Sequence, residues 1–147
     1  MTATADILAG TTVPSCPPAL LRPSWVPEAG RLDVVPAGRW WDALVVPHPV
    51  GVHLVELLAD AVDDALGPII CELWGPVPRA YFLIPTGSGD NSALHGAELL
   101  SSGCFVGVPG MTTRCGPGPH WLSPPDPSQP RRLVNAGALL EAFGGAR

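Results

Sequence analysis

Hydrophobic residues in this chain gather in short runs that Gly and Pro separate, and one run has helical spacing. Over residues 49–66, Val, Leu and Ala recur at positions that make one apolar face, and acidic residues lie mainly on the other. Pro49 suits the first turn of a helix, and Gly67 with Pro68 gives a clear stop. The pattern therefore predicts a long amphipathic helix over 49–66.

The remaining apolar runs are shorter and predict strands. The run at 42–47 is continuously apolar after its first residue, which is typical of a central strand covered on both faces. Further strands are expected at 68–74, 79–84, 96–100, 104–109 and 120–122, and a terminal helix at 133–143. The Gly-Pro-Val-Pro turn at 75–78 makes the first two of these a hairpin. The order of elements predicts a compact α+β fold with a mainly antiparallel sheet, one long helix and a C-terminal helix.

The chain length fits one domain. At 147 residues it can build one core, and its 19 Pro and 17 Gly predict many loops. Residues 1–18 are rich in Thr, Ala and Pro, so we expect a flexible arm there and a single domain over 19–147. No secretory signal pattern and no apolar run of membrane-spanning length occurs. We therefore expect a cytoplasmic protein without membrane association.

The charge pattern bears on nucleic-acid binding. All eight basic residues are Arg, the net charge is −5, and the abundance of Ala, Gly and Pro is typical of GC-rich coding, as in actinobacteria. Strong non-specific binding to nucleic acid depends on many basic residues that release counterions. An acidic chain without a basic run does not fit that class, although net charge leaves a local Arg patch open.

Metal and aromatic chemistry give weaker signals. Cys104, Cys115 and His120 supply three potential ligands, but a four-ligand zinc spacing is absent, so we expect no metal site and no cofactor. The loop at 86–95 lacks the Lys-Ser/Thr of a phosphate loop. Trp residues at 25, 40 and 41 either pack into the edge of the core or form an exposed stacking surface, and burial is the commoner outcome.

Four stretches together resemble a known family. They read Trp-Val-Pro at 25–27, Gly-Arg-Trp-Trp-Asp-Ala-Leu-Val-Val-Pro at 38–47, Arg-Ala-Tyr-Phe-Leu-Ile-Pro at 79–85, and Gly-Cys-Phe-Val-Gly-Val-Pro at 103–109 followed by His-Trp-Leu at 120–122. In order and spacing they resemble the N-terminal domain of bifunctional DNA primase/polymerases (the prim-pol domain), especially short actinobacterial forms. The likeness covers roughly residues 20–125 and implies a reduced archaeo-eukaryotic primase core.

The catalytic pattern of that family is where the chain departs. The polymerases carry two Asp at alternate strand positions, which hold divalent metals for phosphoryl transfer. The corresponding residues 44–48 lack a carboxylate pair, and Asp42 stands alone before them. Arg79 replaces the nucleotide-binding His of the family, and Glu98 is a loose match to its third acid. The resemblance therefore implies the scaffold without polymerase activity.

Three functional hypotheses follow. The first is a non-catalytic prim-pol-like module that binds a nucleotide, a nucleic acid or a protein. Its candidate contacts are Arg39, Trp40, Arg79, Tyr81 and His120. Arg79 suits a phosphate because a guanidinium binds one bidentately.

The alternatives use other residues. Arg79 can instead pair with Glu72 across the predicted hairpin. A residual metal-dependent nucleotidyltransferase would need Asp42, His48 and Glu98 to converge, and only then would a divalent metal be required. The third hypothesis is a small interaction or structural protein, with a protein partner or a homodimer formed through apolar surface. The first and third hypotheses fit the sequence better than the second.

Overall fold

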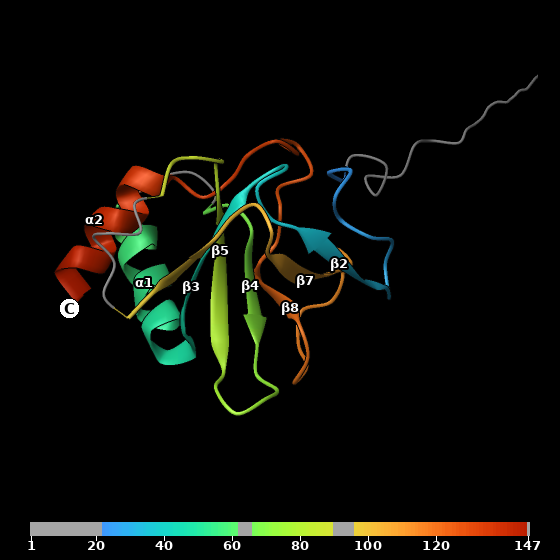
Figure 1. The fold of residues 1–147 in the computed structure, drawn as a ribbon, viewed down its shortest axis with the longest axis horizontal. Helices are drawn as coiled ribbons and strands as arrows, with labels where there is room; N and C mark the ends of the chain where they lie inside the picture. Colours follow the sequence, from blue (N-terminus) through green and yellow to red (C-terminus); the bar gives the residue numbers. More distant parts are fainter. Residues whose placement is uncertain (1–21, 62–65, 90–95, 147) are drawn as a thin grey trace, which may run out of the picture.

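The computed structural model describes residues 22–61, 66–89 and 96–146 and confirms the α+β class. Its elements are labelled as in Figure 1. In order they are β2 (Leu32–Pro36), β3 (Asp42–Pro47), α1 (His48–Ala61), β4 (Ile69–Glu72), β5 (Arg79–Ile84), β6 (Glu98–Leu100), β7 (Phe105–Pro109), β8 (His120–Ser123) and α2 (Ala136–Ala146). The expected N-terminal arm at 1–18 lies outside the described residues.

Two antiparallel sheets form the β structure. The larger has five strands in the order β6-β3-β5-β4-β8, and the smaller pairs β2 with β7. As predicted, 42–47 is an inner strand, with β5 and β6 on its two sides and five of its six residues buried. The predicted hairpin is also confirmed, because β4 and β5 pair directly.

The two faces of the larger sheet have different covers. Helices α1 and α2 lie on the same side of it, at the left of Figure 1, and the β2–β7 pair lies on the other side. Paired residues of neighbouring strands share a face. Leu44 and Phe82 therefore pack toward the helices with Leu54, whereas Val45 and Tyr81 point to the opposite face.

The Trp residues fill the core on that opposite face. Trp25 and Trp41 are buried, and their rings meet edge to face with centroids 5.6 Å apart. Trp25 also lies 6.3 Å from Trp121. Trp40 is half-buried against the same cluster. Core packing is thus confirmed for Trp25 and Trp41, whereas Trp40 keeps a substantial exposed part.

The terminal helix begins later than its apolar pattern predicts. Residues 133–134 lie outside the helix, because the Val134 N–H donates to the Leu83 carbonyl at 2.8 Å and holds the chain against β5. The Asn135 side chain then accepts a hydrogen bond from the Ala138 N–H, as an N-cap does. These contacts fix the start of α2 at Ala136.

The bounds of α1 and β4 were also predicted from the sequence. Helix α1 begins at His48, and residues 62–65 of the predicted helix lie outside the described part of the chain. Strand β4 stops at Glu72, because the Leu73 and Trp74 N–H groups both donate to the Pro117 carbonyl instead of continuing the ladder. Among the described residues, no helix is long and apolar enough to cross a membrane.

Candidate functional site

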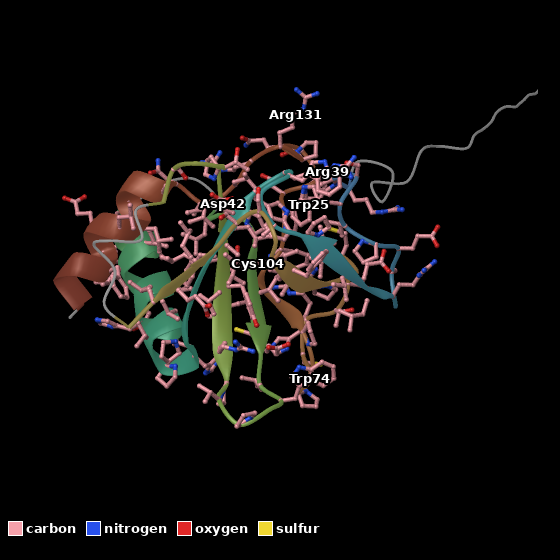
Figure 2. All side chains as sticks on the ribbon, in the orientation of Figure 1. Trp25, Arg39, Asp42, Trp74, Cys104 and Arg131 are labelled. Atoms are coloured by element: carbon pink, nitrogen blue, oxygen red, sulfur yellow. The ribbon has the colours of Figure 1, made fainter. Side chains whose placement is uncertain are left out.

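Four of the five candidate binding residues fall into two groups at opposite ends of β3. Arg79 pairs with Pro47 at the end of this strand, and Tyr81 lies two residues further along β5. Arg39 and Trp40 precede its first residue, Asp42. In Figure 2, Arg39 lies at the upper end of the molecule, and Trp74, which follows β4, lies at the lower end. The structure therefore separates the predicted contacts into two sites.

Glu72 is the centre of the first group. It accepts hydrogen bonds from the Tyr81 hydroxyl at 2.9 Å and from the Trp74 indole at 2.8 Å, and it pairs with the Arg79 guanidinium at 3.4 Å. The guanidinium also lies 5.7 Å from the centroid of the Tyr81 ring. The ion pair between Arg79 and Glu72 is confirmed, so the positive charge of Arg79 already has a partner.

Glu98 lies on the same face as this group. It pairs with Val45, which pairs with Tyr81, so the three side chains share one row across the sheet. A cavity of about 260 Å³ beside them is lined by both Arg79 and Glu98. Two carboxylates here face one guanidinium. The balance of charge around this cavity is negative and opposes a phosphate ligand.

Burial and the same charged residues determine the pKa of Tyr81. Burial raises the pKa of Tyr81 to about 12, and the hydrogen bond to Glu72 and the charge of Glu72 act in the same direction. The carboxylate of Glu98 adds to this increase in pKa, and Arg79 opposes it. Tyr81 is therefore neutral at physiological pH and acts as a hydrogen-bond donor.

The residues that a residual enzyme would need do not converge. Asp42 pairs with Ile84 on the helix-covered face, where its carboxylate accepts a hydrogen bond from the Gly87 N–H at 2.9 Å. Glu98 lies on the opposite face, and His48 begins α1 after the far end of β3. In the described part of the chain, Asp42 serves to tie the loop after β5 to the start of β3.

The potential metal ligands are not gathered either. The described residues contain no group of three or more His, Cys, Asp and Glu side chains that could hold a metal ion. The Nδ1 atom of His120 is instead 2.8 Å from the Gly118 carbonyl, while Cys104 is half-buried and Cys115 is exposed. His120 thus contacts the loop that precedes its own strand, and it pairs with Cys71, the residue before Glu72.

The second group borders a groove that the sequence did not predict. The groove has a volume of about 540 Å³ and is lined by Arg22, Pro23, Ser24, Trp25, Trp40, Pro130, Arg131 and Leu133. Among the described residues, this Arg–Trp groove is lined by two guanidinium groups and by no acidic side chain. Figure 2 shows Arg131 at the same end of the molecule as Arg39 and Trp25.

Two contacts order the basic side chains beside the groove. The Arg22 Nε donates to the Val26 carbonyl at 3.1 Å, which sets the direction of its guanidinium. The Arg39 guanidinium stacks over Trp40, 4.4 Å from the ring centroid. Sequence reasoning found Arg39 and Trp40 but missed Arg22 and Arg131. The Pro-rich segment 124–130 carries Arg131 back to this end of the fold. No local sequence pattern predicts the course of this segment.

No protein-family model, no curated protein and no solved structure matches this chain. The fold and the two sites therefore carry the functional argument.

Proposed function

We propose that this chain is a non-catalytic binding module that holds a phosphate-bearing ligand, a nucleotide or the end of a nucleic-acid strand, in the Arg–Trp groove. The observation that carries the proposal is the lining of that groove, whose described residues include Arg22 and Arg131 and no acidic residue, in a protein with a net charge of −5. The prim-pol-like scaffold is part of the same proposal, with its metal-binding acids lost.

The groove offers two kinds of contact that such ligands use. Guanidinium groups bind phosphate oxygens through paired hydrogen bonds, and Arg131 is exposed at the rim. A nucleobase stacks on aromatic rings and on guanidinium planes. The Arg39 guanidinium, held over the Trp40 ring, offers such a group beside the groove. Phosphate and base can therefore be recognised side by side.

The sheet cavity is a poorer site for the same ligand. The Glu72 carboxylate forms an ion pair with the Arg79 guanidinium at 3.4 Å, and Glu98 adds a second negative charge beside the cavity. Like charges close together raise the free energy of the complex. The proposal thus moves the phosphate from Arg79, where the family resemblance placed it, to the opposite end of β3.

A direct binding measurement tests the proposal. A short 5′-phosphorylated oligothymidylate with a 3′ fluorophore is titrated with the protein at low salt, and anisotropy gives Kd. We expect Arg131→Ala to weaken binding roughly tenfold, since a hydrogen bond to a charged group contributes about 1.5–3 kcal/mol. Arg39→Ala should weaken it by a similar factor, since stacking of a base contributes about 1–3 kcal/mol. Arg114→Ala, which removes the same charge from an exposed loop residue outside the groove, is the matched control and should change Kd little.

Two further ligands distinguish recognition of the phosphate from recognition of the base. The same titration is repeated with the oligonucleotide lacking its 5′-phosphate and with a free nucleoside monophosphate as competitor. Loss of affinity with the first and competition by the second support recognition of a terminal phosphate. Absence of binding at low salt, or an equal loss for Arg114→Ala, would overturn the proposal.

An interaction protein is the second candidate function. The observation that favours it is a set of exposed apolar side chains on the β2–β7 pair, namely Leu32, Val34 and Phe105. Contiguous apolar surface of this kind marks protein-binding sites. A partner that covers it would act on the same scaffold without any chemistry at Asp42, His48 or Glu98.

A further inference from the structure

Among the described residues, no strand lies beside one edge of β2, so that this edge carries main-chain groups without a partner strand. The Arg31 carbonyl accepts from the Gly110 N–H, and the Ala37 N–H donates to the Cys104 carbonyl, so the odd-numbered residues of β2 face β7. In an antiparallel ladder, successive residues direct their N–H and C=O groups to opposite sides. Leu32 and Val34 therefore direct theirs away from β7. In the part of the chain that the structure describes, β2 pairs with β7 alone.

A groove runs along this edge. Its volume is about 310 Å³, and its lining contains four consecutive residues, 33–36, from β2. The rest of the lining is Ser24, Trp25 and Trp40, and no residue of β7 contributes. The groove thus lies between the outward edge of β2 and the segment that carries the Trp side chains. A groove of this volume along the edge of a strand suits a single extended chain, which can add to the edge by main-chain pairing.

The charges along this path are asymmetric. The groove has Ser24, Trp25 and Trp40 in common with the Arg–Trp groove, so the two adjoin at these residues. Asp33 lies at the β2 end, whereas Arg22 and Arg131 lie beyond the shared residues. An occupant of the whole path meets apolar surface in the middle and positive charge at one end.

The exposed apolar side chains are placed to meet such an occupant. Leu32 and Val34 are 48% and 71% exposed, and their partners Pro109 and Gly107 share their face. Phe105, opposite Pro36, lies on the same face. A strand added to β2 places every second side chain beside Leu32 and Val34, and the intervening side chains over Trp25 and Trp40.

We propose that the free edge of β2 binds an extended peptide segment of a partner protein by strand addition. The segment is apolar at alternate positions and acidic at the end that reaches Arg22 and Arg131. Main-chain hydrogen bonds to Leu32 and Val34 supply affinity, and the alternate side chains supply specificity. This inference goes beyond the phosphate-binding proposal and does not rest on it, because its pairing groups belong to the backbone of β2.

Amide exchange on the full-length chain tests the pairing. The probe is a synthetic peptide of alternating valine and threonine with two glutamates at one end, made in both sequence directions. We expect one direction to slow hydrogen exchange of the Leu32 and Val34 amides by roughly tenfold or more at saturation, because pairing closes both N–H groups. Replacing the glutamates with arginines should weaken binding about tenfold, from lost attraction to Arg22 and Arg131.

A single substitution isolates the backbone contribution. Val34→Pro removes an N–H that points away from β7, so the β2–β7 ladder is kept, and proline is tolerated on an edge strand in this orientation. We expect Val34→Pro to abolish peptide binding and Val34→Thr, which keeps the N–H and the branched shape, to retain it. If Val34→Pro does not fold, peptides N-methylated at alternate residues give the same comparison with the unaltered protein.

Three results would overturn the proposal. One is peptide binding that leaves the exchange of both amides unchanged. Another is equal binding by folded Val34→Pro. The third is slow exchange of both amides in the free protein, which would show that the edge is already paired. Oligonucleotide binding by Val34→Pro is measured in parallel, since its retention shows that failure here is separate from failure of the phosphate site.

Discussion

Tyr81 is the one tyrosine of the chain, so its titration can be read without interference from another phenol. The side chain is 7% exposed and donates to Glu72, and its pKa is raised from the ordinary 10.0 to about 12, chiefly by burial. The folded state then holds the proton more tightly than the unfolded state. The stability contributed by this group is complete below pH 10 and is lost as pH rises from 10 to 12.

The prediction for this residue uses phenolate absorbance in the near ultraviolet. We expect a titration midpoint near pH 12 in the folded protein and a lower midpoint in Glu72→Gln, because the substitution removes a negative charge beside the hydroxyl. Glu141→Gln, an exposed acid on α2, is the control and should leave the midpoint unchanged. A midpoint near 10 in the folded wild-type protein would contradict the account of this site.

The contacts of some residues could be predicted from the sequence, and those of others could not. Pairing of Arg79 with Glu72 could be predicted, because the hairpin turn fixes which residues of its two strands face each other. Arg22 and Arg131 could not be brought together in the same way. They are more than a hundred positions apart and meet through loops whose course depends on tertiary contacts.

Helix α1 approaches β5 most closely at Gly51. A Cβ atom added there would lie 2.5 Å from the Cβ of Ala80, far inside normal contact distance. In an open helix, Gly→Ala is stabilising by up to about 1 kcal/mol. Here overpacking, which destabilises by about 1–3 kcal/mol, works against that gain. We expect Gly51→Ala to lower the free energy of unfolding by roughly 1–2 kcal/mol, measured by urea denaturation with Trp fluorescence.

The same substitution elsewhere provides the control. Gly144 lies in α2, and an added Cβ there meets nothing within 4 Å, so Gly144→Ala should be neutral or stabilising. Adding Ala80→Gly to Gly51→Ala removes the opposing methyl group and should restore part of the loss. A Gly51→Ala protein as stable as Gly144→Ala would show that the helix does not depend on this close approach.

At this scale, local patterns predicted the elements better than their pairing. The strands predicted at 96–100 and 104–109 both exist as β6 and β7, on either side of the expected turn. They nevertheless join different sheets, β6 beside β3 and β7 beside β2. The sheet that each strand joins depends on the apolar faces of segments far away in the sequence. The periodicity of one strand holds no information about those segments. For the same reason the groove along β2 was absent from the sequence predictions.

At the scale of the whole molecule, charge is unevenly distributed. The net charge is −5, yet in the described part of the chain the Arg–Trp groove is lined by guanidinium groups without carboxylates. The acidic pair of Glu72 and Glu98 lies on the sheet face near the other end of β3. A small local patch of this kind favours a ligand with few phosphates over a long duplex, because each neutralised phosphate needs its own basic partner.

The exposed apolar face also bears on oligomeric state. Its large side chains in the described structure are Leu32, Val34 and Phe105, and each is already partly covered by its neighbours. A stable dimer buries roughly 800 Å² on each partner, more than three partly exposed side chains provide. A slender peptide that also pairs with the β2 backbone needs less apolar area, because main-chain hydrogen bonds contribute to its affinity.

We therefore expect the protein to be a monomer of 15.3 kDa at micromolar concentration, as measured by size-exclusion chromatography with light scattering. Phe105→Asp should leave this mass unchanged, because an exposed side chain on a monomer has no partner subunit to lose. A mass twice as large that Phe105→Asp returned to 15.3 kDa would contradict this expectation. It would identify the β2–β7 face as the interface of a homodimer.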